Sequence, residues 1–337
     1  MSTIVTGFTP MIDPQRIEAL NDDPVTPGRY VLYWMQASQR EKLNHALEYA
    51  IGQANQRRLP LRRTPLRADS LDMRLGGLDL RDVDGLLGRL RIGRSVKRVP
   101  SFRGGAREAE RRLRAFIANK LDEYHLRRNE PAAGIQSDMS PYLHFGQVSP
   151  VAIALKIRRC GAPQEAKDAY LEELIVQREL SINFVTFNSK YDSYGHAIPP
   201  WARATLSYHS RDKRQPAYSL AQLEAGDTDD PYWNAAQREM ILTGKMHNYM
   251  RMYWGKKILQ WHRRPAEAFR AALHLNNKYE LDGRDPNSYA GVAWCFGKHD
   301  RPWAEREIFG KVRYMNAAGL ERKFDMDAYL RKVDPAR

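Results

Sequence analysis

The sequence predicts a mainly α-helical protein in which a small α/β segment precedes a long run of helices. Two observations carry this prediction: one β-rich stretch followed by one amphipathic helix lies near the N-terminus, and one helical pattern follows another after residue 106. Hydrophobic residues make up 42% of the 337 residues and aromatic residues 10%, which is typical of a globular protein and excludes a disordered chain. A chain of this length can bury one large core or two ordinary ones.

The N-terminal segment begins like a doubly wound α/β domain but does not continue as one. Residues 29–38 are rich in aromatic and β-branched side chains, which predicts a buried strand. Residues 39–58 place their apolar side chains on one face of a helix. Such a domain needs several βα units, and no second unit follows. We therefore predict about one βα unit in residues 1–60, an Arg- and Gly-rich connector with at most short helices in 61–106, and a helical domain in 107–337.

The helices of the long C-terminal part are delimited by prolines in their first turns and glycines near their ends. Residues 230–262 are long enough for two helices, which we expect to divide near Gly244. The other predicted helices are 106–125, 148–161, 163–184, 264–283 and, as the last clear helix, 300–316.

The charge balance indicates a polyanionic partner. The formal net charge is +14, and nucleic acid is the first candidate for a chain this basic, although a solvated basic surface is the alternative. Cys160 and Cys295 cannot form a disulfide framework and have no neighbours at metal-ligand spacing, so we expect no metal site. The sequence shows no signal-peptide pattern and no run of about 20 apolar residues, so we expect an intracellular, cytoplasmic protein.

Two polar stretches suggest binding sites. Ser137 and Ser140 lie in a turn before a predicted helix, where backbone amides can cradle a phosphate; an ordinary helix cap is the competing interpretation. In residues 170–184, charged side chains interrupt a helix that is otherwise full of Leu, Ile and Val, so at least one carboxylate is expected to face a pocket. Surface ion pairs are the alternative there. The charged residues concerned are Glu172, Glu173, Arg178 and Glu179.

Residues 245–262 mix polar and aromatic side chains at helical spacing. Asn248, Arg251 and Met252 share one face of the expected helix. Trp254 and Trp261, seven residues apart, share another face, and Trp233 from the preceding helix could lie close to them. Aromatic residues at this spacing are usually core residues.

The segment 282–303 places tryptophans among charged residues and turn formers. Asp282 offers a partner for Arg251, with Arg284 and Asp285 close by in the sequence. Trp294 lies in what we expect to be a glycine-shaped turn between Gly291 and Gly297. An aromatic side chain next to cations suits the stacking of a nucleobase and the binding of its phosphates. The cations that follow are Lys298, His299 and Arg301.

These stretches resemble a known family. Residues 281–316 are similar throughout to the signature of class II cyclobutane pyrimidine dimer DNA photolyases, in the photolyase/cryptochrome family. Residues 170–184 resemble the family's second signature, with Gln177 where an Arg or a similar residue is usual. The resemblance runs from about residue 94 to 333 and implies an all-helical domain that binds FAD, preceded by a remnant of a Rossmann-like α/β domain. It also implies light-driven repair of pyrimidine dimers in double-stranded DNA, by electron transfer from excited, reduced FAD to a flipped-out dimer.

The resemblance assigns cofactor contacts residue by residue. Tyr124 and the turn 136–140 match the segment that holds the flavin's phosphates, and Arg251 and Asp282 are expected to form a buried pair near the reactive ring edge. Asn276 matches the asparagine that faces the flavin N5. The implied cofactor-binding residues are Tyr124, Gln136, Ser137, Asp138, Met139, Ser140, Asn248, Arg251, Asn276, Asp282 and Arg284.

The resemblance also implies roles in catalysis. Glu173 matches the carboxyl group that hydrogen-bonds the dimer, Met252 a dimer contact and Trp294 the indole on which the flipped dimer stacks, with Asn276 the fourth catalytic residue. Trp254 and Trp233 resemble the pair that carries electrons to the flavin, with Trp261 as a further member. The predicted DNA-binding residues are Trp294, Lys298, Arg301, Lys311 and Arg313, whereas Trp303 is expected in the core.

The N-terminal part departs from the family pattern. The family normally carries a complete α/β domain that can hold an antenna chromophore, so we do not expect an antenna here. A flavin photoreceptor of the cryptochrome kind and a non-catalytic DNA-binding remnant are the alternative functions. We expect a monomer.

Overall fold

A computed structural model gives the fold of the chain in two compact units, which are described separately. One unit comprises Met1–Arg94 and Phe145–Ile153, the other Ser95–His144 and Ala154–Arg337. The described residues are 27–34, 40–64, 82–214 and 216–334, with 12–13, 17, 19, 22, 24 and 25 before them.

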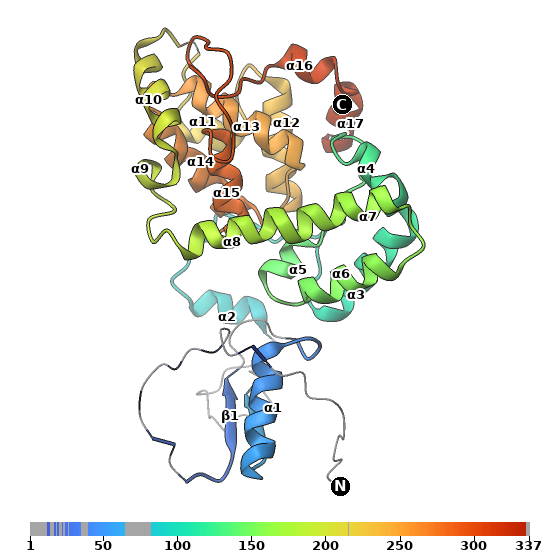
Figure 1. The fold of residues 1–337 in the computed structure, drawn as a ribbon. Coiled ribbons are helices and arrows are strands. Elements are labelled where there is room, and N and C mark those ends of the chain that lie inside the picture. Colours follow the sequence, from blue (N-terminus) through green and yellow to red (C-terminus); the bar gives the residue numbers. More distant parts are fainter. Residues whose placement is uncertain are drawn as a thin grey trace. The chain divides into compact units, whose positions relative to one another are not determined.

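The first unit contains a β-α-β arrangement (Figure 1). Strand β1 (Val31–Trp34) and strand β2 (Leu61–Thr64) pair in parallel, with Val31 opposite Leu61, and helix α1 (His45–Arg57) connects them. Asn44 caps α1 by accepting a hydrogen bond from the Leu47 backbone N–H at 3.2 Å. Parallel strands need such a crossover, so the predicted strand and helix are confirmed in type, although the helix begins six residues later than predicted.

The prediction that residues 61–106 form a connector with at most short helices is wrong for residues 61–64, which form a strand. Residues 61–64 form β2 because Leu61 packs against a small core around Tyr33 and Ala50. A four-residue strand with two arginines lacks the apolar run by which sequence patterns reveal strands. Helix α2 (Val83–Arg89) is one short helix of the kind expected in this stretch. The predicted strand residues 35–38 and the connector residues 65–81 lie outside the described residues.

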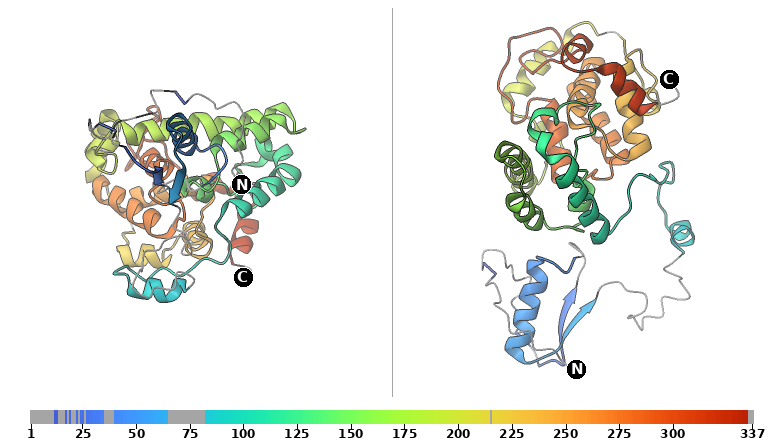
Figure 2. Two further views of the ribbon diagram at one scale, coloured as in Figure 1. Left: turned by 90° about the horizontal axis from the view of Figure 1, so that it is seen from below. Right: turned by 90° about the vertical axis from the view of Figure 1, so that its right-hand side faces the viewer.

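The second unit is built from helices (Figures 1 and 2). Its interior lies around α13, which contacts α12, α14 and α15. None of the described helices is both long and apolar enough to cross a membrane. The α-helices are α3 (Ala106–Asn119), α4 (Tyr124–Arg127), α5 (Ser140–His144), α6 (Pro150–Arg159, shared with the first unit), α7 (Gln164–Leu171), α8 (Arg178–Thr186), α9 (Tyr194–Ala197), α10 (Pro200–Tyr208), α11 (Leu220–Ala225), α12 (Pro231–Thr243), α13 (Asn248–Trp261), α14 (Pro265–Tyr279), α15 (Pro286–Cys295), α16 (Ala317–Glu321) and α17 (Met326–Val333).

The predicted division of residues 230–262 is confirmed. Helix α12 ends at Gly244, whose φ of 71° is the left-handed conformation that glycine adopts without strain. Helix α13 begins after His247, whose side chain accepts from the Tyr249 backbone N–H at 3.2 Å. The two helices are therefore separate elements, and they contact each other in the core.

A close approach between α13 and α15 fixes the position of α15. Gly255 of α13 faces Cys295 of α15, and a Cβ on Gly255 would lie only 2.4 Å from the Cys295 Sγ. A side chain at position 255 would therefore force α15 away from α13. Since α15 carries Trp294 and follows the segment of Asp282, this contact sets where both residues lie.

The predicted last helix, 300–316, is wrong. This stretch is an irregular loop in which the Trp303 N–H donates to the Lys311 carbonyl at 2.8 Å, and Arg306 and Gly310 form an antiparallel bridge. Ile308 and Gly310 have positive φ values of 69° and 52°, which a helix cannot contain. Trp303 is consequently not a core residue, since 42% of it is exposed.

The predicted turn around Trp294 is wrong as well. Helix α15 runs through Gly291, and Trp294 is its penultimate residue. The turn comes after the helix, at Gly297 with its φ of 104°. Gly291 lowers the helical signal of this stretch, but small residues such as Gly291 and Ala293 let α15 pack closely against its neighbours.

Candidate functional site

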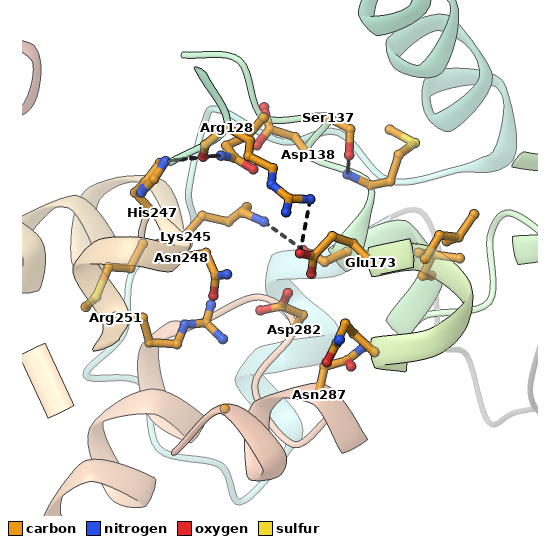
Figure 3. Close-up of a pocket in the computed structure, with 18 of the residues that line it drawn as sticks. Arg128, Ser137, Asp138, Glu173, Lys245, His247, Asn248, Arg251, Asp282 and Asn287 are labelled. Atoms are coloured by element: carbon orange, nitrogen blue, oxygen red, sulfur yellow. Dashed lines mark hydrogen bonds and ion pairs between the residues drawn. The ribbon is translucent and has the colours of Figure 1, made fainter. Parts of the chain in front are cut away.

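A cavity of about 560 Å³ lies within the second unit. Its wall combines the turn before α5, a π-helical turn between α7 and α8, the segment between α12 and α13, and the first turns of α15. Figure 3 shows polar side chains from these separate segments around one space. Eleven predicted site residues line it: Tyr124, Gln136, Ser137, Asp138, Met139, Ser140, Glu173, Asn248, Arg251, Asp282 and Trp294.

The turn 136–140 forms one wall, and hydrogen bonds hold its shape. Gln136 donates from Nε2 to the Arg128 carbonyl at 2.7 Å, and the Tyr170 hydroxyl donates to the Ser137 Oγ at 3.2 Å. Asp138 has a φ of 56°, a left-handed conformation that asparagine and aspartate tolerate better than most residues. Lys245 reaches across from the α12–α13 connection and donates to the Ser140 Oγ at 2.7 Å.

Glu173 is the carboxylate that the helix 170–184 turns toward the cavity. It lies in the π-helical turn Glu172–Gln177, where the wider backbone changes the direction of side chains relative to a regular helix. Its Oε1 lies 3.3 Å from Nη1 of Arg128. Burial raises the pKa of Glu173, while Arg128 opposes this shift. The expectation that one carboxylate faces a pocket is confirmed for Glu173, the only one of the three glutamates that lines the cavity.

The predicted partner of Arg251 is wrong. Its Nη2 contacts the Oε1 of Glu280 at 3.0 Å, and both side chains are buried, with 13% and 1% exposed. Burial raises the pKa of Glu280. Asp282 lies close by, and its pKa is lowered because the attraction of Lys245 and Arg251 outweighs the cost of burial. Spacing alone could not separate the two acids, because a bend of the chain after α14 brings both near the same cation.

Unsatisfied polar atoms mark the same corner of the cavity. Arg251 and Asp282 both line the cavity, and Arg251 Nε and Asp282 Oδ1 are buried without a hydrogen-bond partner among the described residues. Buried polar atoms without partners cost free energy, so such atoms on a cavity wall indicate a missing polar ligand. The corner thus offers both a cation and acceptors to whatever fills the cavity.

His247 supports the wall beside Arg128. Its Nε2 lies 3.1 Å from the Arg128 carbonyl oxygen and 3.0 Å from the Gln136 Nε2. Burial lowers the pKa of His247 to about 4, and the nearby cations Lys332 and Lys245 add to the shift. The ring is therefore neutral at neutral pH and links the turn 136–140 to the start of α13.

Three of the predicted cofactor and dimer contacts do not line the cavity. Asn276 is 1% exposed at the end of α14 and donates from Nδ2 to the Asn277 Oδ1 at 3.1 Å. Arg284 is exposed, with a φ of 68°. Met252 packs against the core, with its sulfur 3.9 Å from that of Cys295. Met252 is next to Arg251, and Arg284 lies two residues after Asp282, so a neighbour of each lines the cavity, whereas no residue of α14 does.

Three predicted tryptophans form one cluster behind the cavity. Trp233 stacks on Trp254 at 6.2 Å between ring centroids, with an interplanar angle of 6°. Trp261 contacts Trp233 edge to face at 5.2 Å. Both indole N–H groups in the stacked pair are satisfied, because Trp233 donates to the Trp254 carbonyl and Trp254 donates to Gln237. The central ring is Trp233, which contacts both others.

Four of the predicted nucleic-acid contacts lie on the loop 297–313, and the fifth, Trp294, lies at the end of the preceding helix α15. Trp294 lines the cavity, and its ring lies 6.0 Å from that of His299. The Lys298 ammonium lies 4.0 Å from the centroid of the Phe184 ring. Arg301 and Arg313 each place a guanidinium over Trp303, at 5.5 and 5.3 Å from its centroid. Lys311 is exposed on the same loop.

Known proteins resemble this chain in sequence over most of its length, although no family model matches it. It is 52% identical over 276 residues to a deoxyribodipyrimidine photo-lyase of Methanothermobacter thermautotrophicus, covering 82% of this chain and 60% of the relative. A protein of the same name from Potorous tridactylus is 46% identical over 258 residues, which are 76% of this chain and 48% of the relative. The chain thus spans about half the length of these relatives.

The chain is therefore similar in sequence to proteins named as photo-lyases and shares the fold of photolyases and cryptochromes. Solved structures share its fold: a class III photolyase from Agrobacterium tumefaciens has a TM-score of 0.56 at 17% identity, covering 91% of this chain and 68% of its own. A cryptochrome from Synechocystis has a TM-score of 0.55 at 17% identity, covering 91% of this chain and 69% of its own. These two likenesses concern the fold alone.

Sequence reasoning missed several residues in the cavity wall and next to it. Arg128 and Lys245 contribute cations, Glu280 pairs with Arg251, and Asn287 at the start of α15 lines the cavity beside Asp282 (Figure 3). Arg128 lies four residues after Tyr124, one helical turn away, which is a signal that the sequence does contain. Glu280 and Asn287 carry no such signal. In the part of the chain that the structure describes, no group of three or more His, Cys, Asp or Glu side chains is arranged to hold a metal ion.

Proposed function

We propose that the chain is a class II photolyase that repairs cyclobutane pyrimidine dimers in DNA with light and reduced FAD. The observation that carries the proposal is the cavity, which joins cations, unsatisfied polar atoms and a half-buried indole in one space. The family relationship supports the same activity, because the relatives over the matched part of the chain are named as photo-lyases.

The cavity fits FAD in size and in charge. About 560 Å³ is within the usual range for sites of cofactors and other small molecules. Two phosphates need cations and amides, which Lys245 and the turn 136–140 supply. A flavin ring presents donors and acceptors at its edge, which would satisfy Asp282 Oδ1 and Arg251 Nε. Reduced FAD, when bound, would supply the light absorption and the electron that the reaction needs.

Glu173 is proposed to hydrogen-bond the dimer. Its carboxyl is 42% exposed, and burial raises its pKa, which favours a protonated form that can donate to a dimer carbonyl. Arg128, 3.3 Å away, would hold the carboxyl in orientation. Trp294, on the same cavity wall, would offer a flat apolar face to the flipped dimer.

The loop 297–313 is proposed to bind the DNA backbone. Arg301 and Lys311 are exposed, and the chain as a whole carries a net charge of +14. Phosphate contacts of this kind give affinity that falls as the salt concentration rises. Lys298 and Arg313 complete the proposed set of contacts.

The tryptophan cluster is proposed to carry electrons toward the flavin. Trp233 contacts both Trp254 and Trp261, so an electron can pass directly from one ring to its neighbour. The proposed role of Asn276 at the flavin N5 stays a prediction. Asn287 lines the cavity and is a second asparagine to test for that role.

The test is a blue-light repair assay on purified protein reconstituted with FAD. We expect flavin absorbance after gel filtration and light-dependent loss of thymine dimers from a duplex oligonucleotide. Protein that retains no flavin would refute the cofactor assignment. Flavin-loaded protein that leaves the dimers intact would favour the photoreceptor alternative, and equal affinity for damaged and undamaged DNA would favour the DNA-binding remnant.

Matched variants separate the assigned roles. Trp294→Ala should retain flavin and lose most repair, whereas Trp201→Phe, outside the cavity, should behave like the wild type. Asn276→Ala and Asn287→Ala are to be compared for the stability of reduced flavin. Equal repair by the wild type and Trp294→Ala would show that the stacking residue lies elsewhere.

A further inference from the structure

A buried histidine ties the loop 297–313 to the helical core. His209, in the short turn after α10, is 9% exposed. Its Nδ1 lies 2.6 Å from the Asp212 Oδ2, and its Nε2 lies 3.0 Å from the Glu305 Oε1. Glu305 belongs to the loop, 96 residues away in the sequence. We call His209, Asp212 and Glu305 the histidine clamp.

The geometry of the clamp specifies the charge on the ring. A neutral imidazole has one N–H donor and one acceptor nitrogen, whereas an imidazolium has two donors. Both ring nitrogens here face carboxylate oxygens, which only accept hydrogen bonds when ionised. Two such contacts therefore require the doubly protonated ring. Burial disfavours the charged ring and lowers its pKa. The hydrogen bonds that the ring donates to Glu305 and Asp212 outweigh burial, so the pKa of His209 is raised.

Further contacts show that the clamp positions the loop backbone. The Ile308 N–H donates to the Asp212 Oδ2 at 2.7 Å, and the Lys311 N–H donates to the Thr205 Oγ1 at 3.1 Å. Gly310 lies so close that a Cβ there would be 2.8 Å from the His209 Cδ2. Ile308 adopts a φ of 69°, which costs a β-branched residue free energy and needs surrounding contacts to maintain it.

The other charged groups around the clamp do not replace the imidazolium. Arg214 donates to the carbonyls of His209, Ser210 and Asp212 rather than to a clamp carboxylate. Arg263 faces Arg214, and the Tyr208 ring lies 5.2 Å from the His209 ring. The Ile308 N–H and His209 together lower the pKa of Asp212. Glu305, 50% exposed, is the carboxylate that can leave most readily.

We propose that His209 is a positioning residue for DNA binding: its imidazolium bridges Asp212 and Glu305 and so holds the loop 297–313 in its DNA-binding conformation. This inference rests on the proposed function, because it concerns how the cations of that loop meet DNA. Below about pH 6.5 the ring is charged in any state, and the clamp is closed. As the pH rises through the raised pKa of the folded protein, one ring nitrogen loses its proton, and the Glu305 contact opens.

The first test is the affinity for a dimer-containing duplex, measured in the dark by fluorescence anisotropy at constant ionic strength from pH 6 to pH 8.5. We expect wild-type binding to weaken roughly tenfold over this range, the size of effect that follows loss of a hydrogen bond to a charged group. His209→Gln should bind weakly at every pH. Glu305→Gln should bind tightly at every pH, because a glutamine amide can donate to a neutral ring.

The variants and readouts keep the outcomes distinct. Glu305→Gln alters only a half-exposed side chain, so it remains informative even where His209→Gln does not fold. His196→Gln, an exposed histidine on α9, is the matched control and should keep the wild-type pH profile. Single-turnover repair at saturating DNA should be unchanged in His209→Gln. A lower saturated rate with unchanged affinity would overturn the positioning role, as would a wild-type profile in Glu305→Gln.

A second measurement separates this inference from the proposed function. Nitrogen-15 spectra of histidine-labelled free protein report the protonation of each ring, and His209 is assigned by its loss in His209→Gln. We expect both nitrogens of His209 to stay protonated above about pH 6.5, the ordinary pKa of histidine. A neutral His209 ring at pH 6.5 would overturn the clamp. Protein whose His209 is charged but which binds no DNA would refute the proposed function and, with it, the clamp's role in DNA binding.

Discussion

The cavity and the loop 297–313 use charge in opposite ways. At the cavity wall, Arg251 pairs with Glu280 behind it; their side chains are 13% and 1% exposed, and they lie on helices or next to them. On the loop, Arg301 and Lys311 are exposed on irregular backbone. A buried ion pair fixes one arrangement, since breaking it leaves an unpaired charge in a low dielectric. Exposed cations attract any polyanion, and salt screens them. Substitutions in the cavity should therefore have larger and more specific effects than substitutions on the loop.

The largest effect is expected for Arg251→Ala. It leaves Glu280 buried without its ion-pair partner and Asp282 with Lys245 as its remaining cation, which should lower the free energy of unfolding by about 3–5 kcal/mol. Flavin binding should be lost as well. Urea unfolding and flavin absorbance measure the two effects. Arg270→Ala, an exposed arginine on α14, is the control and should change stability by less than about 0.5 kcal/mol.

Trp233→Phe should strongly slow the light-driven reduction of bound flavin. The substitution removes the central ring, which contacts both Trp254 and Trp261. Stopped-flow or flash absorbance of flavin under illumination measures the rate. Repair by chemically reduced protein should be unaffected, because that reaction bypasses the cluster. Normal photoreduction in Trp233→Phe would show that the cluster only packs the core and does not carry electrons to the flavin.

Glu173→Gln should lower the repair rate roughly ten- to hundredfold, because a hydrogen bond to or from a charged or acidic group is worth about 1.5–3 kcal/mol. Flavin content should stay the same. Glu172→Gln, the neighbouring residue, which does not line the cavity, is the matched control. Equal losses in the two variants would mean that the π-helical turn, rather than the carboxyl group, matters.

His247 should make the cavity sensitive to acid. Burial lowers its pKa to about 4 from an ordinary 6.5, so the unfolded chain binds a proton that the folded chain rejects. The neutral ring therefore stabilises the folded protein fully above about pH 6.5, and this stabilisation is lost as the pH falls through about 4. We expect the free energy of unfolding of the wild type to fall by roughly 2–3 kcal/mol more than that of His247→Gln across this window. Parallel denaturation profiles would contradict the burial of a neutral ring.

The smallest effect is expected for Lys311→Ala. Loss of one exposed phosphate contact should weaken DNA binding only a few-fold and reduce the slope of log affinity against log salt by about one. Anisotropy at several salt concentrations measures both. A loss of DNA affinity much greater than a few-fold would contradict the comparison between the cavity and the loop, because it would make Lys311 a specific contact.

Helix positions were predictable where the sequence contains both a periodic apolar face and a boundary residue. Gly244 ends α12 at the predicted place, and Pro265 begins α14. The stretch 300–316 has charged residues and one proline as well, yet it forms a loop. Its backbone bonds across to Thr205 and Asp212, and contacts with residues about 100 positions away leave no local pattern.

The sequence by itself determined that this is a basic, mainly helical protein, and the resemblance of its motifs located the turn 136–140, Glu173 and the tryptophans. These are local features, and local spacing places side chains on a helix face or in a turn. Only the tertiary structure decided that Arg251 pairs with Glu280, that Trp303 is exposed between two guanidinium groups, and that His209 holds Glu305. Those pairings depend on how segments that are far apart in the sequence pack together. No local pattern of residues specifies such packing.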